Sequence, residues 1–338
     1  MIDISAAKRV DSIDAPDAAA FLRDVVPRYA PVVLRGLVAD WPVVAAGRRG
    51  DRALVEYLAT LDSGRPVNVF SAPPEQGGRF FYADDMRGLN FGTEQVTLTR
   101  LLVALLELAG EARSPALYAG AAPAAETLVR FATDNPMPLP LPGAEPRIWI
   151  GNRSRIATHY DMSDNIACVA AGRRRFLLFP PGQVSNLHVG PLERTPAGQP
   201  VSMVDPLAPD LSRYPRFAAA SEHMLVAELM PGDALYIPSL WWHHVTAGAA
   251  VNVLVNYWSR PAAAGSPLAA MVHALHTVRD LPEGERGAWR DWFDHYVFGT
   301  DRLDAAAHLP AHAQGVLGPS SPDRDRMVAA FIRNALPG

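Results

Sequence analysis

The pattern of hydrophobic and polar positions changes twice along the chain. Before residue 116, short helical and extended patterns alternate, and the first of them predicts a helix that starts near Asp14 and Pro16. Pro27 ends or kinks this helix, because proline cannot donate a backbone hydrogen bond inside a helix. Further elements are expected in this region: a buried strand at 31–37 and helices at 48–64 and 96–110, each helix closed by a glycine.

Between residues 116 and 260 the pattern becomes that of short β-strands separated by glycine and proline turns. The expected strands lie at 147–152, 165–172, 174–180, 224–230, 234–238 and 251–258. Many short strands with frequent turns predict a jelly roll or a β-sandwich. Two proline-rich loops, 134–146 and 190–217, interrupt these strands. The second is too long for a simple hairpin, and long ordered loops of this kind often form active-site lids or the lips of a binding site; the alternative is disorder.

Helical spacing returns after Arg260, with many aromatic residues between Trp289 and Phe298. The whole pattern therefore predicts a mainly β protein with flanking helices. Three regions are expected: an N-terminal accessory region of helices and strands at 1–115, a β core at 116–260 and a helical region at 261–338.

Composition narrows the class of protein. The chain has 338 residues, of which 49% are hydrophobic, so it can bury a large core. Its formal net charge of −4 gives no overall basic field, and we therefore expect no nucleic-acid partner. Cys168 is the single cysteine, so no intrachain disulfide forms. The N-terminus does not resemble a signal peptide and the most apolar helix is too short to span a bilayer, so we expect a cytoplasmic protein without membrane contact.

Two segments about eighty residues apart carry candidate metal ligands. His159 and Asp161 are two positions apart, so on a strand they point to the same side. His243 follows a short strand that ends in a proline, which places it at the same end of the β core. Two imidazoles and one carboxylate are the ligand set of a non-haem Fe(II) site that activates O2. The alternative is that His243 and His244 are ordinary core histidines beside a tryptophan pair.

The motifs around these residues resemble the jumonji-C/cupin-like family of Fe(II)- and 2-oxoglutarate-dependent oxygenases, most closely its asparaginyl-hydroxylase type and the bacterial relatives of that type. The motifs lie at 159–165, 172–181, 231–245 and 255–258. The resemblance is strong over 116–260 and diffuse elsewhere. It implies a double-stranded β-helix, with His159, Asp161 and His243 as metal ligands and catalytic residues.

The same resemblance implies a 2-oxoglutarate site. It suggests Tyr118, Asn165 and Asn256 as polar contacts of the co-substrate, and Arg174 as the cation for its distal carboxylate. Arg174 stands where related eukaryotic proteins have lysine, but a guanidinium also binds a carboxylate. Where those relatives have threonine, this chain has Ile156, so one hydroxyl group is missing. The hydroxyl of Thr158 or Ser154 would compensate for it.

The residues support part of this site independently. Arg174 shares a strand face with Phe176 and Leu178, and a buried cation on such a face needs an anion. The alternative is that Arg174 is solvated with its arginine neighbours. Asn252 and Asn256 share a face of an apolar strand, which suggests either a lined pocket or paired core amides. The expected walls of the substrate pocket are Trp242, Trp258 and Phe176.

The expected function is an oxygenase that uses Fe(II), 2-oxoglutarate and O2, hydroxylates a protein or peptide side chain, and releases succinate and CO2. A hydroxylase of a small amino-acid-like molecule and a metal-binding cupin that does not use 2-oxoglutarate remain as alternatives, as does a binding module that has lost its chemistry. In related proteins, C-terminal helices form a homodimer interface. We expect the same here; the alternative is a helical cap that packs on its own barrel.

Overall fold

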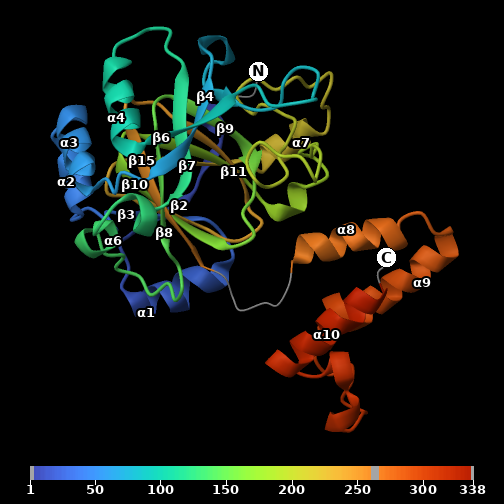
Figure 1. Cartoon of the computed structure of the whole chain (residues 1–338). Helices are drawn as coiled ribbons and strands as arrows, with labels where there is room; N and C mark the ends of the chain where they lie inside the picture. Colours follow the sequence, from blue (N-terminus) through green and yellow to red (C-terminus); the bar gives the residue numbers. More distant parts are fainter. Residues whose placement is uncertain (1–3, 260–265, 336–338) are drawn as a thin grey trace. The chain divides into compact units, whose positions relative to one another are not determined.

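The computed structural model describes residues 4–259 and 266–335, which form two compact units, Met1–Pro261 and Ala262–Gly338 (Figure 1). The boundary expected near residue 260 falls beside this division. The structure gives no boundary at residue 115, because strands from before and after that position hydrogen-bond within one sheet.

The first unit contains a nine-stranded sheet whose strand order mixes distant parts of the sequence. Its strands, in spatial order, are β2 (Asp11–Asp14), β3 (Val32–Arg35), β13 (Ala234–Ile237), β10 (Asp164–Ala171), β15 (Asn252–Ser259), β8 (Pro146–Gly151), β7 (Ala116–Pro123), β4 (Pro66–Ala72) and β6 (Gly92–Thr97). Apart from the parallel pair β2–β3, neighbouring strands run antiparallel.

A six-stranded sheet faces the first one. Its order is β1 (Lys8–Arg9), β12 (Leu225–Leu229), β11 (Arg174–Phe179), β14 (Trp242–Ala247), β9 (Ser154–His159) and β5 (Arg79–Phe80). Its central strands β12, β11, β14 and β9 are antiparallel, and β1 and β5 add parallel edges. Two such sheets face to face confirm the expected jelly roll with flanking helices.

Alternating side chains explain why the sheets face one another. Along β10, Ala167 and Val169 join an apolar cluster between the sheets with Phe176 and Leu254. The intervening Ile166, Cys168 and Ala170 join the cluster on the other side of the sheet. Cys168 is fully buried there, and burial raises the pKa of its thiol. Both faces of β10 are therefore buried, which is why its sequence is a continuous apolar run.

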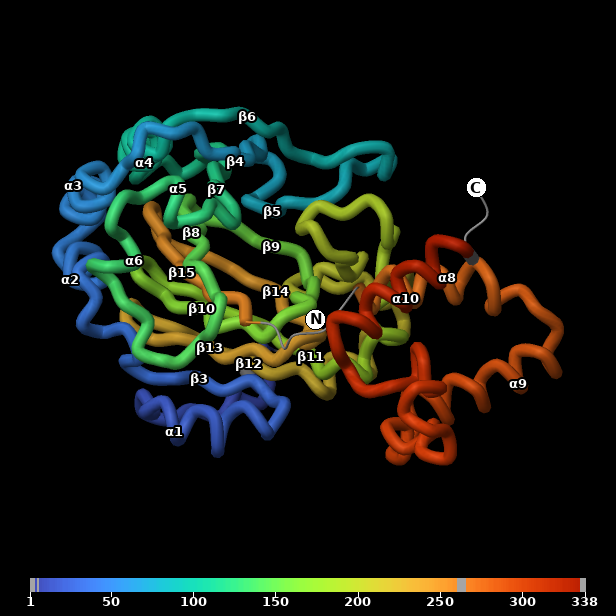
Figure 2. Tube along the Cα trace, turned by 60° about the horizontal axis from the view of Figure 1, so that its bottom comes forward, coloured from blue at the N-terminus to red at the C-terminus, as the bar shows by residue number. Residues whose placement is uncertain are grey.

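Helices from the N-terminal half cover the outer face of the nine-stranded sheet (Figures 1 and 2). They are α1 (Ala18–Ala20), α2 (Pro42–Arg48), α3 (Asp51–Leu61), α4 (Leu98–Glu107), α5 (Ala124–Thr127) and α6 (Phe131–Asp134). The first expected helix starts later than its sequence suggested. Asp17 caps α1 by accepting a hydrogen bond from the Ala20 amide, whereas Asp14 is the last residue of β2.

The outer face of the six-stranded sheet is covered by the long segment between β11 and β12. This segment contains α7 (Phe217–Glu222), and its apolar residues pack on Leu177, Phe179 and Trp242 of the sheet. The second expected proline-rich loop is thus ordered, and its later part, with Val204, Leu207 and Phe217, packs into the core.

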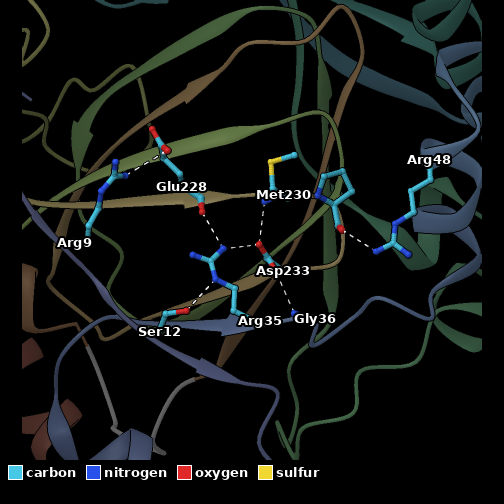
Figure 3. A network of polar contacts seen from close by, with 9 residues as sticks. Arg9, Ser12, Arg35, Gly36, Arg48, Glu228, Met230 and Asp233 are labelled. Atoms are coloured by element: carbon cyan, nitrogen blue, oxygen red, sulfur yellow. Dashed lines mark hydrogen bonds and ion pairs between the residues drawn. The ribbon is translucent and has the colours of Figure 1, made fainter. Parts of the chain in front are cut away.

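Asp233 ties the N-terminal strands to the β core (Figure 3). Its carboxylate accepts hydrogen bonds from the Arg35 guanidinium at 2.7 Å and from the amides of Gly36 and Met230 at 3.1 Å. Arg35 in turn donates to the Glu228 carbonyl and to Ser12. One carboxylate thus joins β3, the β12–β13 turn and β2.

The second unit is helical, with α8 (Pro267–Thr277), α9 (Glu283–Phe293) and α10 (Pro322–Ala335). Within its described residues, Ala306 is the single buried apolar side chain. In the described ranges of the whole chain, no helix has the combination of length and apolar character needed to cross a membrane.

Candidate metal centre

Three side chains that the sequence suggested as metal ligands meet between the sheets. His159 is the last residue of β9, Asp161 follows two residues later, and His243 is the second residue of β14. His159 and His243 are direct cross-strand partners. One ligand atom from each of the three residues lies within 4.8 Å of the other two.

Backbone contacts fix the orientation of both imidazoles. His159 Nδ1 lies 2.8 Å from the carbonyl oxygen of Ala157, and His243 Nδ1 lies 3.0 Å from that of Trp241. A carbonyl oxygen accepts, so each Nδ1 carries the proton and each Nε2 keeps a free lone pair. Metal-binding histidines are usually oriented in this way. His243 Nε2 lies 3.7 Å from Asp161 Oδ2.

A chain of hydrogen bonds holds the carboxylate. The Asn165 amide donates to Asp161 Oδ2 at 2.9 Å, and the Asn256 amide donates to Asn165 Oδ1 at 3.2 Å. The Trp149 indole then donates to Asn256 Oδ1 at 2.6 Å. This Trp149–Asn256–Asn165–Asp161 chain runs through β8, β15 and β10, so the position of the carboxylate depends on the nine-stranded sheet.

The protonation state of His159 suits metal binding. Burial, together with the nearby His243, lowers its pKa to about 4, against an opposing effect of Asp161. The imidazole is therefore neutral near pH 7, as a metal ligand must be.

The three residues open into a cavity of about 50 Å³ that also contains the suggested 2-oxoglutarate contacts. Tyr118, Asn165, Arg174 and Asn256 all line it. Arg174 is 4% exposed, and its Nε has no hydrogen-bond partner. Among the described residues no carboxylate lies within 4.0 Å of its guanidinium, so this buried cation lines the cavity without an ion-pair partner.

Burial also sets the protonation of the Tyr118–Arg174 pair. It lowers the pKa of Arg174, an effect that Tyr118 opposes. It raises the pKa of Tyr118, which Arg174 in turn lowers. The phenol therefore stays neutral and presents a hydroxyl to the cavity beside the guanidinium.

Other expected site residues divide between the two sides of the sheets. Phe176 and Trp258 line the cavity. Trp242 does not; it lies on the outer side of β14, where its ring packs 4.8 Å from that of Tyr160. Thr158 is also absent from the lining, because it alternates with His159, and its buried Oγ1 has no partner. Asn252 donates to the carbonyls of Ala249 and Asn152 and is a paired core amide.

His244 lies on the outer side of β14, opposite to its neighbour His243. It is 3% exposed, and neither ring nitrogen has a hydrogen-bond partner. Burial lowers its pKa to about 3. The imidazole is neutral and does not line the metal cavity.

Sequence reasoning did not name Trp149, and it noted Ile156 only as the position where relatives have threonine; both residues line the cavity. Trp149 could have been found from the alternation in β8, where Ile148 and Ile150 point to the helical side. Ile156 lies three residues before His159, on the same side of β9. The register of β9 and β14 shifts between these two residues, and the sequence gives no signal for that irregularity.

Most of the chain matches a known protein family. A family model described as a cupin-like domain matches residues 18–264. The chain belongs to this family. The matched residues thus include β3, β4 and the helices before residue 116, which agrees with the place of these elements in the first unit.

Two relatives align over most of the cupin-like chain. A tRNA wybutosine-synthesizing protein 5 from Gallus gallus is 26% identical over 83% of this chain and 91% of its own length. A bifunctional peptidase and (3S)-lysyl hydroxylase from Homo sapiens is 28% identical over 72% of this chain and 81% of its own. A lysine-specific demethylase from Arabidopsis thaliana is 33% identical over 32% of this chain and 20% of its own. The predicted resemblance to jumonji-C and cupin-like proteins is confirmed.

Proposed function

We propose that this cupin-like protein is an Fe(II)- and 2-oxoglutarate-dependent oxygenase that hydroxylates a protein or peptide side chain. The observation that carries the proposal is the convergence of His159, Asp161 and His243, with both Nε2 atoms free and the carboxylate hydrogen-bonded by Asn165. Two histidines and one carboxylate leave open positions on iron for a co-substrate and for O2. The hydroxylase among the relatives supports the reaction type.

The residues present fit both groups. His159, Asp161 and His243 would hold the iron. Arg174, whose buried charge has no carboxylate beside it, would pair with the distal carboxylate of 2-oxoglutarate, and the Tyr118 hydroxyl would donate to the same group. When bound, the iron and 2-oxoglutarate supply the oxidising chemistry, with O2 consumed and succinate and CO2 released.

The protein contributes position and exclusion of water. The cavity of about 50 Å³ is smaller than ordinary ligand pockets of roughly 300–1,000 Å³. A dicarboxylate therefore enters only if the side chains around Arg174 move apart. Phe176, Trp258 and Leu254 form apolar walls that keep water from the reacting atoms.

The test requires no substrate. We expect the apo-protein, given Fe(II) and 2-oxoglutarate without oxygen, to develop the visible metal-to-ligand charge-transfer band of a chelated 2-oxo acid. His159→Ala and His243→Ala should abolish the band, whereas His244→Ala, with its side chain on the outer side of the strand, should retain it. Iron binding without a band would favour the alternative of a cupin that does not use 2-oxoglutarate.

The substrate class separates the remaining alternatives. The tRNA-linked relative makes RNA a rival, but the net charge of −4 opposes binding to a polyanion. A protein or peptide is our choice, with a small amino-acid-like molecule as the second candidate. Mass spectrometry of peptides, free amino acids and transfer RNA incubated with the loaded enzyme would decide, because hydroxylation adds one oxygen atom to the true substrate.

We also propose that the protein is a cytoplasmic homodimer. The single cysteine fits a reducing compartment. The second unit exposes large apolar side chains, including Trp292 at 58%, Phe298 at 72% and Leu303 at 84%. A helical unit with so few buried residues needs a partner surface, and a second copy of the same unit would supply it.

A further inference from the structure

A second cavity, of about 230 Å³, adjoins the metal centre. It shares four of its lining residues with the metal cavity: Tyr118, Trp149, Ile156 and His159. A group that enters this second cavity therefore lies next to a metal ligand, although nothing in the metal chemistry requires the cavity to exist.

Aromatic rings form one wall of the second cavity. Phe70 on β4, Phe80 on β5 and Phe91 before β6 pack in edge-to-face pairs with ring centroids 5.2–6.5 Å apart. Tyr118 continues this wall, 5.7 Å from Phe80, and Trp149 follows at 5.9 Å. These rings come from four strands of both sheets and one loop, so the fold itself fixes the wall.

The opposite rim is a short loop held at both ends. The Tyr82 hydroxyl donates to the Arg194 carbonyl at 2.7 Å, and the Ser202 amide donates to the Thr158 carbonyl at 2.7 Å. Between these two anchors, Pro196, Ala197 and Gly198 line the cavity. The loop closes the pocket with small uncharged residues.

The chemistry of the lining limits the occupant. The lining contains no aspartate, glutamate, lysine or arginine. A charged side chain that entered would lose its water without gaining an ion pair, which is unfavourable. The Arg174 cation beside Tyr118 further disfavours an ammonium or a guanidinium. An uncharged apolar group meets no such penalty and gains contact with the rings.

The size fits one large side chain. An apolar cavity of about 150 Å³ holds a benzene molecule. A cavity of about 230 Å³ therefore has room for a phenyl or branched aliphatic group together with the atoms that attach it to a peptide.

Gly120 keeps this space open. A Cβ at this position would lie 3.2 Å from the Phe70 ring, 3.3 Å from Trp149 and 3.4 Å from Tyr118. Any larger side chain here must enter the pocket or displace its aromatic wall.

We propose that this aromatic pocket, lined by Phe70, Phe80, Phe91 and the 196–198 loop, is a specificity site that takes an uncharged large apolar side chain of the substrate. The inference rests on the proposed oxygenase function and narrows its substrate to peptides with an aromatic or branched aliphatic residue at, or next to, the oxidised position.

The test uses five-residue peptides of alanine with Phe, Leu, Lys or Asp at the centre. Each is added without oxygen to protein loaded with Fe(II) and 2-oxoglutarate, and the shift of the charge-transfer band gives its dissociation constant. We expect the Phe or Leu peptide to bind at least tenfold more tightly than the Lys and Asp peptides. Equal affinities, or tighter binding of the Lys or Asp peptide, would overturn the proposal.

Two variants connect the preference to the pocket. Gly120→Val should weaken binding of the Phe peptide at least tenfold. Gly248→Ala, at an exposed glycine with open space around it, should leave the affinity for this peptide unchanged. Phe91→Ala removes one half-buried ring and should shift the preference toward a peptide with Trp at its centre. The band before peptide addition reports cofactor loading in each variant, so only loaded proteins are compared.

The experiment distinguishes failure of the specificity proposal from failure of the oxygenase proposal. Without a band, the oxygenase proposal fails, and quenching of tryptophan fluorescence in the metal-free protein still reports whether the Phe peptide binds beside Trp149. With a band but no preference among the peptides, the specificity proposal alone is wrong.

Discussion

Asp161 is the candidate ligand whose position depends most on its neighbours, because it lies beyond the end of β9. Neither strand geometry nor a backbone carbonyl orients it, in contrast to the two histidines. The Asn165 amide therefore orients the carboxylate, just as the carbonyl oxygens of Ala157 and Trp241 orient the two imidazoles.

Replacing Asn165 with alanine should loosen this carboxylate. Loss of a residue that orients a metal ligand typically lowers metal affinity by about 10–100-fold. We expect a change of that size in the dissociation constant for Fe(II), measured by anaerobic titration. Asn68→Ala, an exposed amide on β4, serves as the matched control and should leave iron affinity unchanged. Equal iron affinity in both variants would show that Asp161 needs no support.

The sequence indicated the three candidate ligands through their strand spacing and the motifs around them, and the choice of His243 over His244 rested on the family resemblance. Trp242 and Thr158 were expected from the sequence to line the site, but neither does. The alternation of side chains along a strand predicts this result. If His243 and His159 point between the sheets, the residue before each must point outward. The aromatic wall of Phe70, Phe80 and Phe91 was not predictable, because these residues come from segments that only the folded sheets bring together.

At the scale of elements, the strands are held by a few polar contacts as well as by the core. Asp233 in the β12–β13 turn accepts three hydrogen bonds from β3 and its own turn (Figure 3).

Asp233→Ala should lower the free energy of unfolding by about 2–3 kcal/mol, because two amides and the Arg35 guanidinium lose their acceptor. Urea unfolding followed by circular dichroism would measure this. Asp40→Ala, at an exposed position, should change stability by less than about 0.5 kcal/mol, and a similar loss in both variants would contradict the assignment.

Glu228 makes the pairing of β1, β12 and β11 depend on pH. The Arg175 guanidinium, which donates at 2.8 and 3.0 Å, holds the pKa of this carboxyl below its ordinary value of 4.5, and Arg9 adds to the effect. The unfolded chain binds the proton more readily than the folded one. The stabilisation is therefore present above pH 4.5 and is lost as the pH falls through the lower folded value.

Comparison of the wild type with Glu228→Gln measures this contribution. Because the pair is about half exposed, the wild type should be more stable by less than about 1 kcal/mol at neutral pH. The difference should vanish in acid and shrink in high salt. A difference that persisted at pH 2 would mean that packing rather than charge supports this edge.

The elements themselves were mostly predictable, since apolar alternation and turn residues are local signals. The start of the first helix was not, because Asp14 and Asp17 are equally good caps and only the pairing of β2 with β3 assigns Asp14 to a strand. The boundary at residue 115 was wrong for a similar reason. A change from mixed to β-rich sequence does not reveal that β3 and β4 belong to the same sheet as β10.

At the scale of the whole molecule, the exposed apolar residues of the second unit predict self-association. We expect light scattering to give twice the mass of 36.5 kDa at micromolar concentration. Trp292→Ala with Phe298→Ala should raise the dissociation constant of the dimer at least tenfold, because large aromatic side chains dominate interfaces. Leu22→Ala, which alters an equally exposed apolar residue of the first unit, should have no effect. A wild-type monomer at this concentration would rule out the dimer.

Burial of Cys168 has a practical consequence for the two units. Its thiol is fully enclosed beneath the helices, and its raised pKa keeps it protonated, so it is a poor nucleophile toward maleimides and other alkylating labels. A cysteine introduced on the surface of each unit would then be the only reactive thiol there. Fluorophores or spin labels attached at such a pair report the distance between the units, and its change with ligands, in the otherwise unmodified protein.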